Sequence, residues 1–326
     1  MARLSMSEAI VAGLREELAA DERVFCLGQD IGSFGGALQS HRGLWNEFGK
    51  TGRIIEAPIS EEGMVGMSVG AALCGMRPVV EIMFAEFLNL AMVPLANEAG
   101  QIHFKTDGLL RVPMVVRTMF GTNADLGHAE DYHSMLAHAP GLKVVMPSGA
   151  RDAKGLIKSA IRDDNPVVFC EHMGLLHARR EEVPDEEYLV PIGLADVKRP
   201  GRDVTIVATA LMLHRTLKAA EQLAREDGIE AEVIDPRTIL PLDRETILAS
   251  VRKSGRLVIV HETWRTGGSG AEMAAVVAEE GFSALRAPIV RVAPAHIPIP
   301  YSAPLQKLFY PEEASIVEAV RRVARY

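Results

Sequence analysis

The stretch from Ala57 to Phe87, APISEEGMVGMSVGAALCGMRPVVEIMFAEF, decides the fold of the chain. From Glu61 onward, small residues recur at helical spacings, which predicts a helix that can lie very close to a neighbouring helix or chain. The apolar run from Val79 to Met83 then predicts a buried strand. A helix leading into such a strand is typical of an α/β domain with a mostly parallel sheet.

The same alternation extends on both sides of this stretch. Near the N-terminus, Ser5 and Glu8 have the spacing of a capping box and predict a helix that ends near Asp21. Between the helical stretches, short apolar or extended runs predict further strands of the same sheet, at residues 24–27, 54–58, 114–117, 143–146 and 167–169.

The segment RREEVPDEEYLVPIG, residues 179–193, is charged and contains proline, so it is a candidate linker or lead-in to a strand. Beyond it, apolar runs alternate with helical patterns again. We therefore expect an α/β protein of two domains with mostly parallel sheets, residues 1–185 and 186–326. The expected strands of the second domain are 204–208, 231–234 and 257–260, and its helices include 211–227 and 270–280.

Composition excludes several classes of function. The 326 residues are 48% hydrophobic and 24% charged, which is the composition of a globular protein. The net charge is −8 and no dense basic run occurs, so nucleic acid and anionic membrane are poor partners. The longest weakly polar stretch, Met64 to Met76, is shorter than the ~20 residues that a bilayer requires. We expect no transmembrane span.

The N-terminus has no apolar signal core, which favours a cytoplasmic protein. Its three cysteines, Cys26, Cys74 and Cys170, are far apart and surrounded by apolar residues. We interpret them as buried thiols, because neither a disulfide framework nor a CxxC metal site is available.

Two patterns that superficially suggest ligand sites are weak. The glycine clusters at 32–36 and 267–270 fit neither a dinucleotide fingerprint nor a phosphate loop, and tight turns or helix N-termini explain them equally well. His128, His133 and His138 occur at intervals of five, which would place their side chains on different faces of a helix and disfavours a shared metal. For His133 and His138, a polar loop followed by a helix is the simpler interpretation.

Five separated motifs nevertheless resemble one known family, in the same order along nearly the whole chain. The chain is similar to the beta subunit of thiamine diphosphate-dependent 2-oxo acid dehydrogenases, which include pyruvate, branched-chain 2-oxo acid and acetoin dehydrogenase components. The resemblance implies a pyrimidine-binding domain followed by a transketolase C-terminal-like domain. The motifs are the stretch 57–87, HAPGLKVVMPS, AKGLIKSAIRDDNPVVF, VIDPRTILPLD and HETWRTGGSGAEMAA.

The resemblance assigns a role to Glu61, which by itself could simply complement a helix dipole. The matching glutamate hydrogen-bonds the pyrimidine ring of thiamine diphosphate, and protonation there lets the amino group of the cofactor deprotonate the thiazolium carbon. Ile59 and Phe87 match further cofactor-binding positions, Phe87 as the aromatic residue against the pyrimidine, although it could equally be a core aromatic.

His128 matches the active-site histidine of the family, which is assigned to substrate orientation and to proton transfer during acyl transfer to lipoamide. The chain departs from the family here. Many relatives have His-Ser-Gln-Ser where this chain has His128-Ala129-Glu130-Asp131, and the preceding loop, Gly121 to Gly127, is also unlike the usual one. These differences leave the substrate open.

The resemblance also implies a potassium ion, held by backbone carbonyls and side-chain oxygens. Oxygen ligands suit such a hard cation, but Asp163 and Asn165 before Pro166 could equally be ordinary turn residues. The matching ligand positions are Met114, Ala160, Ile161, Asp163 and Asn165.

The chain contains no Gly-Asp-Gly, the motif with which thiamine diphosphate enzymes hold Mg²⁺ and the diphosphate. The resemblance therefore implies an alpha subunit with that motif, an α2β2 heterotetramer with shared active sites, and a lipoyl acyltransferase core that receives the acyl group. The substrate would be a 2-oxo acid or acetoin. The alternatives are a transketolase-like or deoxyxylulose phosphate synthase-like fragment, which the chain length disfavours, and a non-catalytic regulatory subunit of the same fold. The presence of Glu61 disfavours the non-catalytic regulatory subunit.

Overall fold

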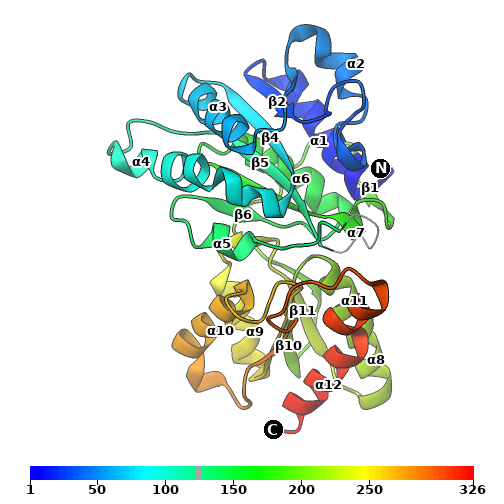
Figure 1. Cartoon of the computed structure of the whole chain (residues 1–326). Coiled ribbons are helices and arrows are strands. Elements are labelled where there is room, and N and C mark those ends of the chain that lie inside the picture. Colours follow the sequence, from blue (N-terminus) through cyan, green and yellow to red (C-terminus); the bar gives the residue numbers. More distant parts are fainter. Residues whose placement is uncertain (122–126) are drawn as a thin grey trace. The chain divides into compact units, whose positions relative to one another are not determined.

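The computed structural model of the chain describes residues 1–121 and 127–326, which form two compact units (Figure 1). The first unit contains residues 1–121 and His128–Ile192, and the second contains Gly193–Tyr326. Each unit is an α/β structure with its own sheet. The prediction of an α/β fold with two mostly parallel sheets is thus confirmed.

The first unit is built on a parallel sheet in the order β6-β7-β5-β4-β2-β3. Its central strands β2, β5 and β7 are buried along their whole length, as expected for a parallel sheet with helices on both faces. These strands are β2 Val24–Gly28, β3 Ile54–Glu56, β4 Arg77–Phe84, β5 Val115–Phe120, β6 Lys143–Val145 and β7 Val167–His172.

Helix α1 (Met6–Ala20) begins at the expected capping box. Ser5 Oγ accepts a hydrogen bond from the Glu8 N–H at 3.2 Å, and Glu8 Oε2 accepts one from the Ser5 N–H at 2.8 Å. The buried face of α1 packs on α6 (Ala150–Arg162), and α3 (Glu61–Leu73) packs on β4. The remaining helical segments are α2 Leu44–Phe48, α4 Ile102–Lys105, α5 His133–Ala137, α7 Met173–Leu176, η1 Ala37–Gln39, η2 Gly49–Thr51, η3 Ala85–Ala91 and η4 Val93–Ala99.

The charged segment after residue 179 begins with a strand, β8 (Arg180–Val183), which pairs antiparallel with β1 (Ala2–Ser5). Arg180 donates hydrogen bonds to the Arg3 carbonyl at 3.1 Å and to Glu8 at 2.5 Å. Three of the four residues of β8 are not buried, so charged side chains are tolerated there. The sequence of β8 therefore has no apolar pattern that would predict a strand.

The second unit has a five-stranded sheet in the order β14-β13-β10-β11-β9, parallel except for the edge strand β9. Helices α8 and α12 pack against each other, and their buried residues join one apolar core with those of the strands. The elements are β9 Asp196–Arg199, β10 Val204–Ala208, α8 Ala210–Asp227, β11 Ala231–Asp235, β12 Thr238–Leu240, α9 Arg244–Ser254, β13 Leu257–Val260, α10 Ser269–Glu280, η5 Phe282–Ala284, β14 Val290–Val292, α11 Ala303–Phe309 and α12 Glu313–Ala324.

A buried ionic cluster lies in the sheet of the first unit. Arg117 on β5 donates two hydrogen bonds to Glu171 on β7, at 2.6 and 3.0 Å, and lies 3.6 Å from Glu81 on β4. The Ser40 hydroxyl donates to Glu81 at 2.9 Å, and His41 Nδ1 lies 3.6 Å from the same carboxyl group. Burial raises the pKa of Glu81 to about 7, whereas burial and Arg117 lower the pKa of His41.

The prediction that all three cysteines are buried is wrong for one of them. Cys26 and Cys170 are buried in β2 and β7, but Cys74 is exposed at the end of α3. The adjacent Leu73 and Gly75 are exposed as well, so small and apolar residues do not mark a core here. In the part of the chain that the structure describes, no helix is long and apolar enough to cross a membrane.

Candidate functional site

Glu61 is the first residue of α3, directly after the extended segment that follows β3. Only 8% of the residue is exposed, yet its carboxylate makes no hydrogen bond or ion pair within residues 1–121 and 127–326. The carboxylate oxygens are not among the buried side-chain atoms that lack a hydrogen-bond partner, so they reach the surface of the described chain. Glu61 is therefore suited to a polar partner that comes from outside the described chain.

The surface next to Glu61 is exposed, and apart from Ser60 and Glu62 its side chains are small or apolar. Ile59 is 80% exposed and precedes the helix by two residues. On α3, Gly63, Gly66 and Gly70 are exposed, and at Gly70 no atom lies within 4 Å of the position that a Cβ would occupy. This face can therefore be covered closely, as the spacing of small residues predicts.

The segment 84–87 and His128 form a compact cluster in the same unit. The imidazole of His128 stacks on the ring of Phe84, with 4.2 Å between the ring centroids and 10° between the planes. The Phe87 ring lies 5.5 Å away, tilted by 57°. Glu86, on η3, contacts His128 Nδ1 through its Oε1. The structure thus brings together two predicted site residues, Phe87 and His128, and adds Phe84 and Glu86.

The two acidic residues after His128 have different surroundings. Glu130 lies against Glu86, and its carboxylate accepts a hydrogen bond from the Ala129 N–H at 3.2 Å. Burial raises the pKa of Glu86, the neighbouring Glu130 raises it further, and His128 opposes this effect. Asp131 is directed elsewhere, because it contacts His133 Nδ1. Within the loop that precedes His128, residues 122–126 lie outside the described residues.

The predicted potassium ligands lie together around the end of α6, but an arginine already donates to two of them. Arg77 Nη1 donates to the carbonyl oxygens of Ile161 and Asp163, at 2.8 and 3.0 Å. The Ala160 carbonyl accepts from the Asp163 N–H at 3.3 Å, and the Met114 carbonyl accepts from the Val167 N–H at 3.0 Å. Asn165 Nδ2 donates to the Asp163 carboxylate at 3.0 Å. In this arrangement a potassium ion would compete with the Arg77 guanidinium for the same oxygens.

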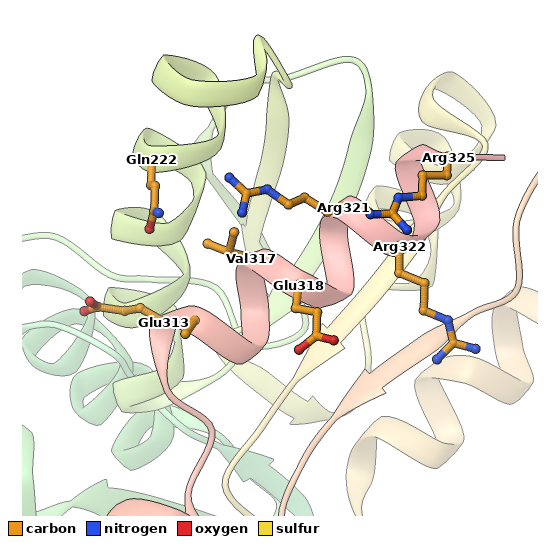
Figure 2. Close-up of a pocket in the computed structure, with 8 residues that line it drawn as sticks. Gln222, Glu313, Val317, Glu318, Arg321, Arg322 and Arg325 are labelled. Carbon is orange, nitrogen blue, oxygen red and sulfur yellow. The ribbon is translucent and has the colours of Figure 1, made fainter.

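Two surface grooves contain none of the predicted site residues. One, of about 560 Å³, lies between α8 and α12 of the second unit, where Arg321, Arg322 and Arg325 line it together with Gln222 and Glu313 (Figure 2). The other, of about 680 Å³, lies beside α1 of the first unit. Among residues 1–121 and 127–326, no group of three His, Cys, Asp or Glu side chains could hold a metal ion.

Sequence reasoning missed Phe84 and Glu86, although both stand in the motif that contains Phe87. Glu86 and His128 are 42 positions apart, and only the tertiary fold brings them into contact. An acidic residue between two aromatic residues directly after a buried strand was the available signal.

Comparison with known proteins identifies both units. Residues 2–178 match the transketolase pyrimidine-binding domain, and residues 193–316 match the transketolase C-terminal domain. A solved structure described as "Split gene transketolase, inactive beta4 tetramer" superposes with a TM-score of 0.80, covers 99% of each chain and has 22% sequence identity. That likeness shows the fold.

Curated relatives match over the full length. The pyruvate dehydrogenase E1 component subunit beta of Bacillus subtilis is 40% identical, and the 2-oxoisovalerate dehydrogenase subunit beta of the same organism is 39% identical, each over 100% of both chains. The beta subunit of acetoin:2,6-dichlorophenolindophenol oxidoreductase from Cupriavidus necator is 40% identical over 99% of this chain and 98% of its own.

Proposed function

The chain belongs to the family of transketolase-like beta subunits of 2-oxo acid and acetoin dehydrogenases, and from this premise we propose that it binds thiamine diphosphate together with an alpha subunit and transfers an acyl group to lipoamide. The observation that carries the proposal is Glu61, a largely buried residue whose carboxylate reaches the surface with no partner among the described residues, at the start of a helix with exposed glycines.

Thiamine diphosphate, when bound, supplies a carbon nucleophile that attacks the carbonyl group of the substrate. Glu61 would exchange a proton with the pyrimidine ring, and the rest of its side chain is already largely covered by the first unit. Ile59 and Phe87 would contribute contacts to the ring. His128, 36% exposed and fixed against Phe84, would orient the substrate and deliver a proton during acyl transfer.

An alpha partner is supported by the surface of the first unit. Large apolar side chains are exposed on the neighbouring elements α3, η3, η4 and α4, where a monomer would normally have few. We propose that the alpha subunit covers them in an α2β2 assembly and supplies the Gly-Asp-Gly that holds Mg²⁺ and the diphosphate. A lipoyl acyltransferase core would receive the acyl group. The exposed residues are Met67, Leu73, Leu90, Val93 and Phe104.

The substrate of the proposed enzyme is a 2-oxo acid or acetoin. The curated relatives include both kinds of enzyme at 39–40% identity. A substrate screen of the assembled enzyme, with pyruvate, 2-oxoisovalerate and acetoin, decides between them. Potassium at the end of α6 stays a prediction.

The test is Glu61→Gln in the enzyme assembled with its alpha subunit, with Glu62→Gln as the matched control because Glu62 is adjacent and exposed. An amide has nearly the shape of the carboxyl group but cannot relay the proton. We expect Glu61→Gln to keep the circular dichroism spectrum and to lose roughly 100-fold or more in turnover, whereas Glu62→Gln retains activity. Turnover of Glu61→Gln within about threefold of wild type would refute this role.

A further inference from the structure

The imidazole of His128 is fixed on three sides by residues of one short segment. Phe84 covers one face at a centroid distance of 4.2 Å, and the Phe87 ring lies 5.5 Å from the imidazole. Glu86 engages Nδ1 at the ring edge. A ring that is stacked flat and hydrogen-bonded at one edge has little rotational freedom. The segment 84–87 therefore determines the direction in which His128 points.

The Glu86 contact also distinguishes the two ring nitrogens. A carboxylate accepts hydrogen bonds, so the hydrogen of a neutral His128 ring belongs on Nδ1. His128 Nε2 makes no hydrogen bond to any residue within 1–121 and 127–326. Since 36% of the side chain is exposed, Nε2 is the nitrogen that can exchange a proton with a bound molecule.

We propose that Glu86 is a positioning residue that holds His128 by Nδ1 and presents Nε2 to the substrate. The inference rests on the proposed function, in which His128 acts in acyl transfer. In that step the imidazolium form of His128 acts, with its Nδ1–H held by Glu86 and its second proton on Nε2. The S–S bond of the lipoyl dithiolane breaks, one sulfur bonds to the acyl carbon, and the other takes the Nε2 proton, which leaves the neutral Nδ1–H ring. The dithiolane is the oxidant, and the acyl fragment of the substrate supplies the electron pair. Nε2 regains a proton from solvent.

Glu130 completes the arrangement, because it faces Glu86 from the segment that carries His128 itself. Burial first and then Glu130 raise the pKa of Glu86, so the charged form that holds Nδ1 is lost as the pH falls through that raised value. Glu130→Gln removes the neighbouring carboxylate. Acyl transfer by this variant should therefore persist to lower pH than in wild type.

The decisive experiment compares Glu86→Gln, Glu86→Ala and Glu86→Asp with Glu98→Gln, an exposed glutamate on η4. The first measurement is a long-range ¹H–¹⁵N spectrum of the histidine-labelled full chain above pH 8, with His128→Ala to assign the signal. We expect the Nδ1–H form in wild type, Glu86→Asp and Glu98→Gln. Glu86→Ala, and to a smaller degree Glu86→Gln, should show a mixture of both tautomers.

The second measurement uses the assembled enzyme in two assays, acylation of a lipoyl domain and reduction of an artificial electron acceptor. We expect Glu86→Ala to lose roughly tenfold or more in kcat for acylation but to change the rate of acceptor reduction by less than about threefold. Glu86→Asp should retain part of the acylation activity that Glu86→Ala loses. A wild-type tautomer spectrum in Glu86→Ala, or equal losses in both assays without rescue, would overturn the proposal. If wild type itself turns over neither a 2-oxo acid nor acetoin, the proposed function fails, while the spectrum still decides the role of Glu86.

Discussion

At the scale of single residues, burial determines how Glu81 titrates. Its carboxyl group lies inside the sheet beside Arg117 and Ser40, and burial raises its pKa from the ordinary 4.5 to about 7. Because the folded chain holds this proton more tightly than the unfolded chain, the stability that neutral Glu81 contributes is complete below pH 4.5. It is lost as the pH rises through 7.

We predict that Glu81→Gln, which stays neutral, removes this loss. Between pH 4.5 and 8 the free energy of unfolding of the wild type should fall by about 2–3 kcal/mol more than that of the variant. Urea titrations in a Trp264→Phe background follow the first unit through Trp45, and exposed Glu22→Gln serves as control. Parallel pH profiles of wild type and Glu81→Gln would show that Glu81 is not the group responsible.

The predictability of each site residue depended on whether its signal was local. Glu61 stands in a contiguous motif, and His128 was selected through the family resemblance although its neighbours depart from the family pattern. Glu86 was not selected, because its local signal is weak and its contact with His128 depends on the packing of two segments 42 positions apart. Cys74 was misjudged because its small and apolar neighbours resemble a core, whereas they form an exposed face of α3.

At the scale of elements, the end of α6 is connected to β4 by Arg77. Its guanidinium donates to the carbonyls of Ile161 and Asp163 and, at 2.7 Å, to the carboxylate of Asp164. Among the described residues, Arg111 contacts Asp164 alone, from a more exposed position. Substitutions of these two arginines can therefore be compared to distinguish the stability contributed by the carbonyl contacts from that contributed by a surface ion pair.

We predict that Arg77→Leu lowers the free energy of unfolding by about 1–3 kcal/mol, since it leaves half-buried acceptors unpaired, and that Arg111→Leu costs less than about 1 kcal/mol. The oxygens freed in Arg77→Leu are ligands of the type that potassium prefers. Potassium chloride should therefore restore part of the lost thermal stability, beyond choline chloride at equal ionic strength. Identical recovery in the two salts would argue against a cation site at the end of α6.

Helices and strands were predicted closely only where the sequence signal lies within the element itself. Long apolar strands such as β10 and helices with clear caps such as α1 were predicted closely, since their signals are contained within the element. The pair β1 and β8 was not, because β8 is charged and becomes a strand only by pairing with a segment near the N-terminus. Pairing over such a distance leaves no periodic pattern in the chain.

At the scale of the whole molecule, the proposed function gives this chain one half of a cofactor site. Glu61 and the exposed face of α3 are suited to a pyrimidine ring and to a close neighbour, but the sequence has no Gly-Asp-Gly for Mg²⁺ and a diphosphate. Contacts to a ring alone give much weaker binding than contacts to both ends of a ligand, since the doubly charged diphosphate contributes most of the electrostatic attraction.

We therefore predict that the isolated chain binds thiamine diphosphate and Mg²⁺ too weakly for calorimetric detection at micromolar concentration, and that the alpha subunit restores tight binding. Glu61→Gln should weaken binding to the assembled enzyme, whereas it should change nothing in the isolated chain, because there is no binding to lose. Alpha subunit alone is the matched control for the diphosphate contacts. Tight, Mg²⁺-dependent binding to this chain by itself would mean that the diphosphate site lies within it, and the two-subunit proposal would then have to be abandoned.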